Sequence, residues 1–296
     1  SLRRRQRQMC IRDRIGVAVN QINTMIDRTL ASTLVEGSIS ALNYANKLNG
    51  FVMAMFITSV AAVIYPMLSK LSSEDNKEKF TSSVVQSINS VILLVIPISV
   101  GAIVLATPIV KLLFQRGEFD ARATSMTAIA LIMYSIGMVA FGLRDILGKV
   151  FYALQDTKTP MINGAIAMVM NIVLNIILVK YLQLAGLALA TSISAIVCIF
   201  LLFGSLKKKI GYFGQDKIMK TTIKSIVSAA IMGVVTYFAY DIVSNLLGIG
   251  FIKEAVSLVI SVAIGAITYG ILVGVLKVDE INIMTDMVKK KLNRVA

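Results

Sequence analysis

Phe151-Tyr152-Ala153-Leu154-Gln155-Asp156-Thr157-Lys158-Thr159-Pro160 separates two long apolar segments of the chain. Pro160 suits the first turn of a helix, where its missing N–H group costs nothing. Thr157 or Thr159 can cap that helix, and Asp156 and Lys158 mark a short aqueous connection. The stretch therefore predicts a loop followed by a membrane span.

The composition places the whole chain in a membrane. Of its 296 residues 56% are hydrophobic and 16% are charged, and the mean hydropathy is +0.79. A soluble domain would carry about 25% charged residues. Apolar runs of about 20 residues recur along the chain, and each is long enough to cross a bilayer. We therefore predict an all-α, polytopic transmembrane helix bundle.

Several function classes are not expected. The chain has no histidine and two cysteines, Cys10 and Cys198, which show no metal-ligand spacing. It lacks a Walker A sequence and a nucleophile elbow, so neither an ATPase nor a hydrolase is predicted. We expect no enzyme, no catalytic residue and no cofactor. The net charge of +14 is attributed to loops beside anionic lipid, and no nucleic-acid partner is expected.

Eight spans are predicted, which puts both ends of the chain on one side of the membrane. Lysine is concentrated in the connections on that side, so both ends are expected to be cytoplasmic. Residues 277–296 then form a basic cytoplasmic tail. The predicted spans are 15–35, 43–68, 82–107, 122–150, 160–181, 185–206, 218–243 and 253–276.

Residues 1–14 have a different character. They hold six arginines and one aspartate, begin without Met, and lack the apolar core of a signal peptide. We interpret them as a non-native basic leader, with the gene continuing upstream. The alternative is a genuine basic cytoplasmic tail.

The first predicted span is unusually polar. Asn20, Thr24 and Asp27 follow the spacing of one helical face, and Arg28 lies beside them. A charge at bilayer depth costs about 3 kcal/mol on insertion scales. Such residues therefore predict a water-filled cavity. The alternative is a hydrogen-bonded Asp27–Arg28 pair near one membrane surface.

Further ionisable residues extend this prediction. Arg144 and Asp145 form an apparently buried pair late in the fourth span, and Lys47 lies early in the second. Arginine binds phosphate oxygens bidentately and lysine offers a point charge, so these cations suit a phosphate-rich headgroup. The predicted headgroup cavity contains Arg28, Lys47, Arg144, Asp145, Asn20 and Thr24.

A second polar set suggests a sodium site. Asn171 and Asn175 are four residues apart, so they share one face of the fifth span. Thr191 and the carbonyl of Leu187 could approach from the sixth span, and Asp27 would add one negative charge. Hard oxygen ligands of this kind suit Na⁺ better than a soft metal. The alternative is simple hydrogen bonding between helices.

Three further stretches accompany Gln155-Asp156-Thr157-Lys158-Thr159-Pro160. They are Ala41-Leu42-Asn43-Tyr44-Ala45-Asn46-Lys47-Leu48, Tyr65-Pro66-Met67-Leu68-Ser69 and Leu113-Phe114-Gln115-Arg116-Gly117-Glu118-Phe119. In this order and spacing, the chain resembles the MurJ/MviN lipid II flippases from about residue 15 to its C-terminus. The MATE drug exporters belong to the same superfamily.

The resemblance implies an architecture. Residues 15–206 would form the six-helix C-terminal lobe of a flippase, and 218–276 a terminal helix pair with a groove for the lipid tail. These would correspond to helices seven to fourteen of the family, with the N-terminal lobe missing. Lys47 would match the family's cavity cation.

The resemblance also implies an activity. The protein would translocate lipid II, an undecaprenyl-pyrophosphate-linked peptidoglycan precursor, across the bacterial cytoplasmic membrane by alternating access. Na⁺ or proton coupling would supply energy, and the cell-wall synthesis machinery would be a partner. Alternatives are a MATE drug/ion antiporter, a polysaccharide flippase, or a non-transporting cell-wall scaffold.

Overall fold

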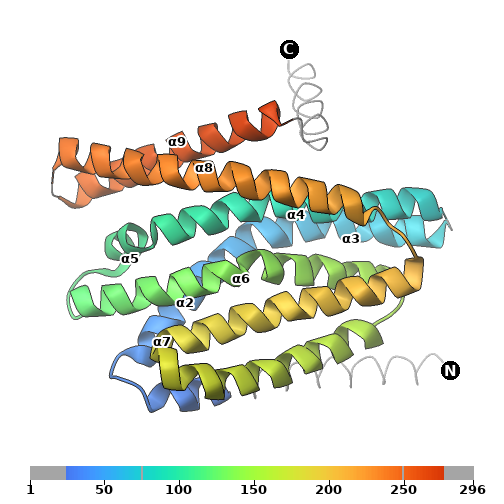
Figure 1. Ribbon diagram of the computed structural model, residues 1–296, viewed down its shortest axis with the longest axis horizontal. Coiled ribbons are helices and arrows are strands. Elements are labelled where there is room, and N and C mark those ends of the chain that lie inside the picture. The colour runs from blue at the N-terminus through green and yellow to red at the C-terminus, as the bar shows by residue number, and fades with distance from the viewer. Residues whose placement is uncertain (1–24, 75, 249, 277–296) are drawn as a thin grey trace.

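The computed structural model describes residues 25–74, 76–248 and 250–276, and Figure 1 shows them as a bundle of long helices. Within these ranges every regular element is helical, in agreement with the predicted fold class. Residues 25–32 are helical and precede the labelled elements. Those elements are α2 (Ser38–Val52), η1 (Met53–Ile57), α3 (Thr58–Ser73), α4 (Lys77–Val104), α5 (Ala106–Phe114), α6 (Ala121–Ala153), α7 (Lys158–Ile210), α8 (Gln215–Leu247) and α9 (Phe251–Val275).

Six helical stretches in the described ranges are long and apolar enough to cross a membrane. One is the continuous run Ser38–Ser73, which contains α2, a wider π-helical turn η1, and α3. It extends beyond the predicted span 43–68 at both ends, because helical hydrogen bonding continues into polar residues outside the apolar run. The first part of the predicted first span 15–35, up to residue 24, lies outside the described residues. The total of eight spans therefore stays a prediction.

α7 is a hairpin within one 53-residue element. Gln183 leaves the helical conformation, with φ 48° and ψ −124°, and the two limbs run back along each other (Figure 1). The limbs match the predicted spans 160–181 and 185–206. Gly186 lies at the turn, where a Cβ atom would collide with the carbonyl oxygen of Leu178. The missing side chain therefore permits the tight reversal.

The core has two hydrophobic clusters at different depths in the bundle. The larger cluster joins α3, α4, α6 and the second limb of α7, and the smaller joins α2, α5, α6 and the α7 turn. The Ser192 hydroxyl donates to the carbonyl oxygen of Met133 at 2.6 Å and thereby ties α7 to α6. Gly137 permits this close approach, because a Cβ there would lie 2.6 Å from the Cα of Ser192.

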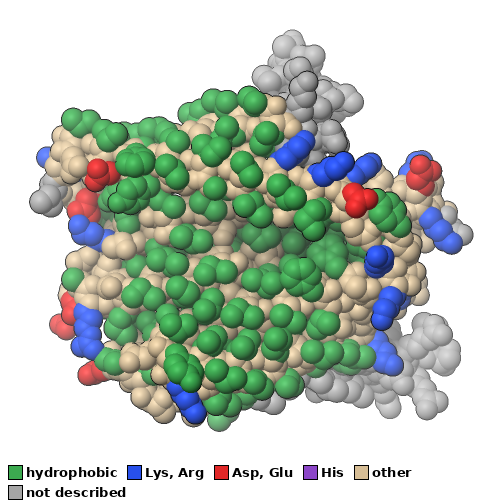
Figure 2. All heavy atoms as spheres, viewed as in Figure 1, with side chains coloured by type: hydrophobic (Ala, Val, Ile, Leu, Met, Phe, Trp, Pro, Cys, Tyr) green, Lys and Arg blue, Asp and Glu red, His purple; other side chains and the backbone are tan. Residues whose placement is uncertain are grey.

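α8 and α9 pack on each other and against α4. The Tyr269 hydroxyl lies 2.9 Å from the carbonyl oxygen of Leu93, to which it donates, and 2.7 Å from the hydroxyl of Ser225. Small residues such as Gly265 and Ser261 fill the contact and leave large apolar side chains outside. Figure 2 shows this apolar flank, with charged side chains gathered at the two ends of the bundle.

Candidate functional site

A chain of polar side chains crosses from the helical segment 25–32 to both limbs of α7. Asn175 donates through Nδ2 to Asp27 Oδ1 at 2.6 Å and to Asn171 Oδ1 at 3.0 Å. Asn171 Nδ2 contacts the Thr191 hydroxyl at 3.4 Å, and that hydroxyl donates to the Leu187 carbonyl at 3.0 Å. The structure thus brings together all five residues that the sequence grouped into one site.

The oxygens of this polar chain are only partly satisfied. Asn171 and Asn175 are buried, and the Asn175 Oδ1 atom has no hydrogen-bond partner among the described residues. A buried polar atom without a partner costs about 1–3 kcal/mol. The unpaired amide oxygen is in the same side chain that contacts the Asp27 carboxylate. Such oxygens suit a hard cation, so the chemistry of these residues fits Na⁺.

The predicted headgroup residues are placed differently. Arg28, Lys47, Arg144 and Asp145 are all exposed in this chain, so the expected burial of Arg144 and Asp145 is wrong. Arg144 and Asp145 lie on an exposed part of α6, where water or another part of the protein can solvate their charges. Asn20 and Thr24 lie outside the described residues.

Lys47 and Arg144 occur at different depths. The Lys47 ammonium lies 5.4 Å from the ring centroid of Tyr44, which packs against Phe119 just before α6 begins. Arg144 is 23 residues into α6, about 35 Å along the helix axis. The exposed cations are therefore spread along the bundle.

Asp156 joins the two limbs of α7 at the opposite end from Gln183. Its Oδ1 accepts from the backbone N–H groups of Lys158 and Thr159, and its Oδ2 accepts from the Thr159 hydroxyl and, at 2.6 Å, from Lys209 Nζ. Asp156 therefore caps the start of α7, whereas we expected Thr157 or Thr159 to do so. Partial burial acts to raise the pKa of Asp156, but the hydrogen bonds from Lys209 and Thr159 outweigh it and lower the pKa to about 2.

The sequence reasoning missed this ion pair. Lys209 is the last of three consecutive lysines in the final turn of α7, a run that by itself indicates only the end of a span. Asp156 and Lys209 are 53 residues apart, so only the length of the hairpin could have suggested their contact. A hairpin that turns near Gln183 brings together residues that are about equally far from the turn in sequence. The nearly equal spacing of Asp156 and Lys209 from Gln183 could therefore have indicated their contact.

Comparison with known proteins identifies the family. The sequence profile described as "Lipid II flippase MurJ" matches residues 3–258. The chain belongs to the MurJ lipid II flippase family. A "Probable lipid II flippase MurJ" of Vibrio cholerae is 35% identical over 86% of the chain, and one of Haemophilus influenzae is 32% identical over 92%. The matched range begins at residue 3, and the non-native origin of residues 1–14 stays a prediction.

The structural comparison agrees with MurJ. The solved structure "Lipid II flippase MurJ, inward closed conformation" has a TM-score of 0.74 and 29% identity over 90% of this chain. A MOP-superfamily transporter from Pyrococcus furiosus has a TM-score of 0.61 at 15% identity, which shows the shared fold alone. The chain spans about half the length of these relatives: 48% of the Vibrio protein, 55% of the Haemophilus protein and 53% of the MurJ structure.

Proposed function

We propose that the chain is the C-terminal half of a lipid II flippase that works in the bacterial cytoplasmic membrane. The observation that carries the proposal is the MurJ profile match over residues 3–258, supported by the MurJ-like arrangement of helices. The sugar, peptide and pyrophosphate of lipid II cannot cross hydrocarbon unaided. A transporter must therefore offer the headgroup a polar path while the tail stays in lipid.

In this proposal, residues 15–206 form the second lobe and 218–276 the terminal pair whose groove holds the lipid tail. The other half of the protein supplies the first lobe. Alternating access requires two halves that rock about a central site. The exposed Arg28, Lys47 and Arg144 would face the first lobe across the cavity, together with Asp145, Asn20 and Thr24. The spread of these cations along the bundle suits successive contacts with a pyrophosphate during translocation.

We propose further that Na⁺ binds at the polar chain and that the sodium gradient across the membrane supplies the energy for transport. Asp27 would provide the charge, and the unpaired oxygen of Asn175 a second ligand. Asn171, Thr191 and the Leu187 carbonyl would complete the site after a modest rearrangement of their hydrogen bonds. Proton coupling through Asp27 is the alternative.

The orientation follows from charge. The connections α3–α4, α6–α7 and α7–α8 lie at one end of the bundle (Figure 1), where Lys70, Lys77, Lys79, Lys158, Lys207 and Lys208 are found. Basic connections favour the cytoplasmic side. Both ends of the chain would then be cytoplasmic, near the cytoplasmic steps of cell-wall synthesis.

Growth rescue tests the flippase proposal. The N-terminal half of the Vibrio cholerae relative would be joined to this chain and expressed in bacteria depleted of their own lipid II flippase. We expect rescue, its loss with Lys47→Ala, and its retention with Lys180→Ala, an exposed lysine on α7 outside the proposed cavity. A correctly inserted chimera that fails to rescue would favour a drug exporter, a polysaccharide flippase or a scaffold.

Thermal unfolding of the purified chain tests the sodium site. We expect Na⁺ to raise the melting temperature relative to K⁺, and Asp27→Asn or Asn175→Ala to abolish that difference. Asn163→Ala is the matched control, because Asn163 is also buried on α7 but bonds to Ser205 away from the polar chain. Equal melting temperatures in Na⁺ and K⁺ for the unmodified chain would contradict a sodium site. A melting temperature that does not respond to Na⁺ but rises at low pH would favour proton coupling.

A further inference from the structure

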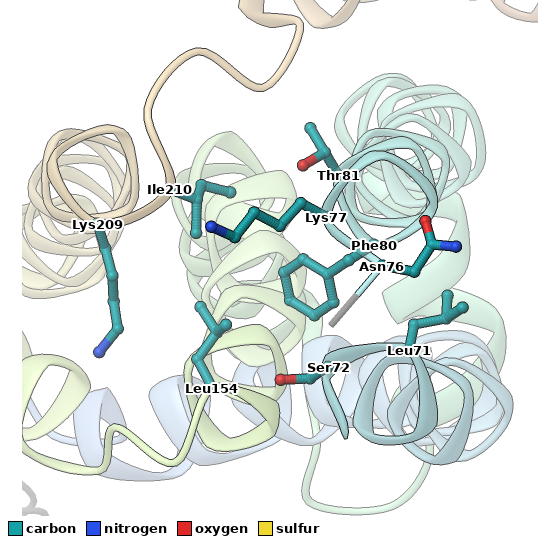
Figure 3. A pocket seen from close by; sticks show the side chains of 9 residues that line it. All are labelled: Leu71, Ser72, Asn76, Lys77, Phe80, Thr81, Leu154, Lys209 and Ile210. Carbon is teal, nitrogen blue, oxygen red and sulfur yellow. The ribbon is translucent and has the colours of Figure 1, made fainter. Parts of the chain in front are cut away.

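A cavity of about 280 Å³ opens at the lysine-rich end of the bundle (Figure 3). It lies where the end of α3, the start of α4 and the ends of α6 and α7 meet. Phe80, Leu154 and Ile210 form apolar walls, and Ser72 and Lys77 supply polar groups. The cavity is remote from the polar chain, because Lys209 at its rim is about 27 Å along α7 from Thr191. It therefore has no part in the proposed sodium site.

Lys77 is the group in this cavity that is available to a ligand. Figure 3 shows its side chain extended across the cavity toward Ile210, while the ammonium of Lys209 points away, toward its bond with Asp156. The Ser72 hydroxyl points inward from the opposite wall. Within the described ranges no residue forms an ion pair with Lys77. An unpaired ammonium between apolar walls can be neutralised by an anion with an apolar portion.

The surroundings reinforce the positive potential. Lys77 is the first residue of α4, where the helix dipole contributes a partial positive charge. Among the nearby acids, Asp156 binds Lys209 and Glu74 lies 3.8 Å from Lys70, while Glu78 in the first turn of α4 is exposed and forms no ion pair with Lys77 within the described ranges. The cationic charge at Lys77 is therefore not cancelled by these carboxylates.

We infer that this cavity binds an anionic glycerophospholipid of the adjacent leaflet. The Lys77 ammonium would pair with the phosphate, Ser72 would donate a hydrogen bond, and Phe80, Leu154 and Ile210 would contact the glycerol and the first acyl carbons. The apolar walls favour a lipid over free phosphate, which would gain nothing from them. The volume is at the lower end of small-ligand sites, so it suits a simple headgroup better than a sugar-peptide.

Native mass spectrometry of the purified 296-residue chain in detergent would test this inference. The chain is titrated with phosphatidylglycerol, with phosphatidylcholine of the same acyl chains, and with inorganic phosphate as competitor. One lysine near an anionic lipid surface changes binding about fivefold. We expect Lys77→Gln to weaken phosphatidylglycerol binding about fivefold, and Lys79→Gln, on the same helix but outside the cavity lining, to change it less than twofold.

The outcomes are decisive in either direction. Equal effects of the two substitutions, or equal binding of the two lipids, would overturn the inference. Complete displacement of phosphatidylglycerol by millimolar phosphate would reveal a free-anion site and overturn the lipid assignment. Lys77 is exposed, so Lys77→Gln should melt at the unmodified temperature without lipid, which separates lost binding from lost folding. Because no lipid II transport is measured, the result is independent of the flippase proposal.

Discussion

Replacing Asp156 with alanine should loosen the base of the α7 hairpin by about 2 kcal/mol. An N-terminal cap contributes about 1 kcal/mol, and Asp156 accepts two backbone N–H bonds at the start of α7. Its ion pair with Lys209 adds at most about 1 kcal/mol, because water screens a pair whose lysine side chain is 36% exposed. Asp156→Asn keeps a capping oxygen and should cost about half as much as Asp156→Ala.

The assay is equilibrium unfolding in mixed detergent micelles, followed by circular dichroism, as a double-mutant cycle. Lys209→Ala alone should cost no more than about 1 kcal/mol, and the double substitution should cost less than the sum of the two. Lys208→Ala, the exposed neighbour, is the control and should be neutral. Strict additivity of Asp156→Ala and Lys209→Ala would refute the proposed coupling between the limbs.

The same contact predicts a dependence on pH. The pKa of Asp156 is about 2 in the folded protein, against about 3.9 for an unfolded aspartate. A lowered pKa stabilises the folded state above the unfolded value, so this contribution is complete above about pH 5 and is lost progressively as the pH falls to about 2 and below. Asp156→Asn should flatten that part of the stability profile. An unchanged acid slope in Asp156→Asn would show that other carboxylates dominate it.

Two further substitutions address helix packing in the same unfolding assay. Gly137→Ala should cost about 1–3 kcal/mol, because its methyl group meets the backbone of Ser192, whereas Gly148→Ala on the same helix meets nothing and should stabilise by up to about 1 kcal/mol. If Gly137→Ala and Gly148→Ala changed the free energy of unfolding equally, the close contact between α6 and α7 at Gly137 would add no stability. Tyr269→Phe removes the hydroxyl bond to α4 and should cost about 1 kcal/mol, while Tyr237→Phe, exposed on α8, should cost nothing. A neutral Tyr269→Phe would show that the hydroxyl bond adds no stability.

The sequence predictions that were confirmed rest on local patterns, namely long apolar runs and the spacing of polar residues along one helix. Long apolar runs gave an all-helical membrane chain, and the loop at Gln155–Pro160 was placed correctly. The spacing of Asn171 and Asn175 put both on one helical face, and the structure brings Thr191 and Asp27 to them. Their binding of sodium is still a proposal, because hydrogen bonding alone also accounts for the contacts.

Tertiary contacts account for what the sequence did not predict. Asp156 displaced the threonines as cap because the same carboxylate also reaches Lys209 across the hairpin. Arg144 and Asp145 looked buried because they lie in an apolar run, yet they point outward from α6. Burial depends on which helix face meets a neighbour, and hydropathy averages over all faces.

Two polar contacts on the terminal helix pair define a hydrophobic thickness for this protein. Lys111 pairs with Glu254 at 2.7 Å in the first turn of α9, and the Lys224 ammonium donates to the Leu276 carbonyl just past its end. The two contacts are about 33 Å apart along α9, close to the hydrocarbon depth of about 30 Å. A bilayer with much longer acyl chains would draw both contacts into hydrocarbon. The pair would then have to tilt less or the lipid would have to thin, so membrane composition should influence its docking on α4.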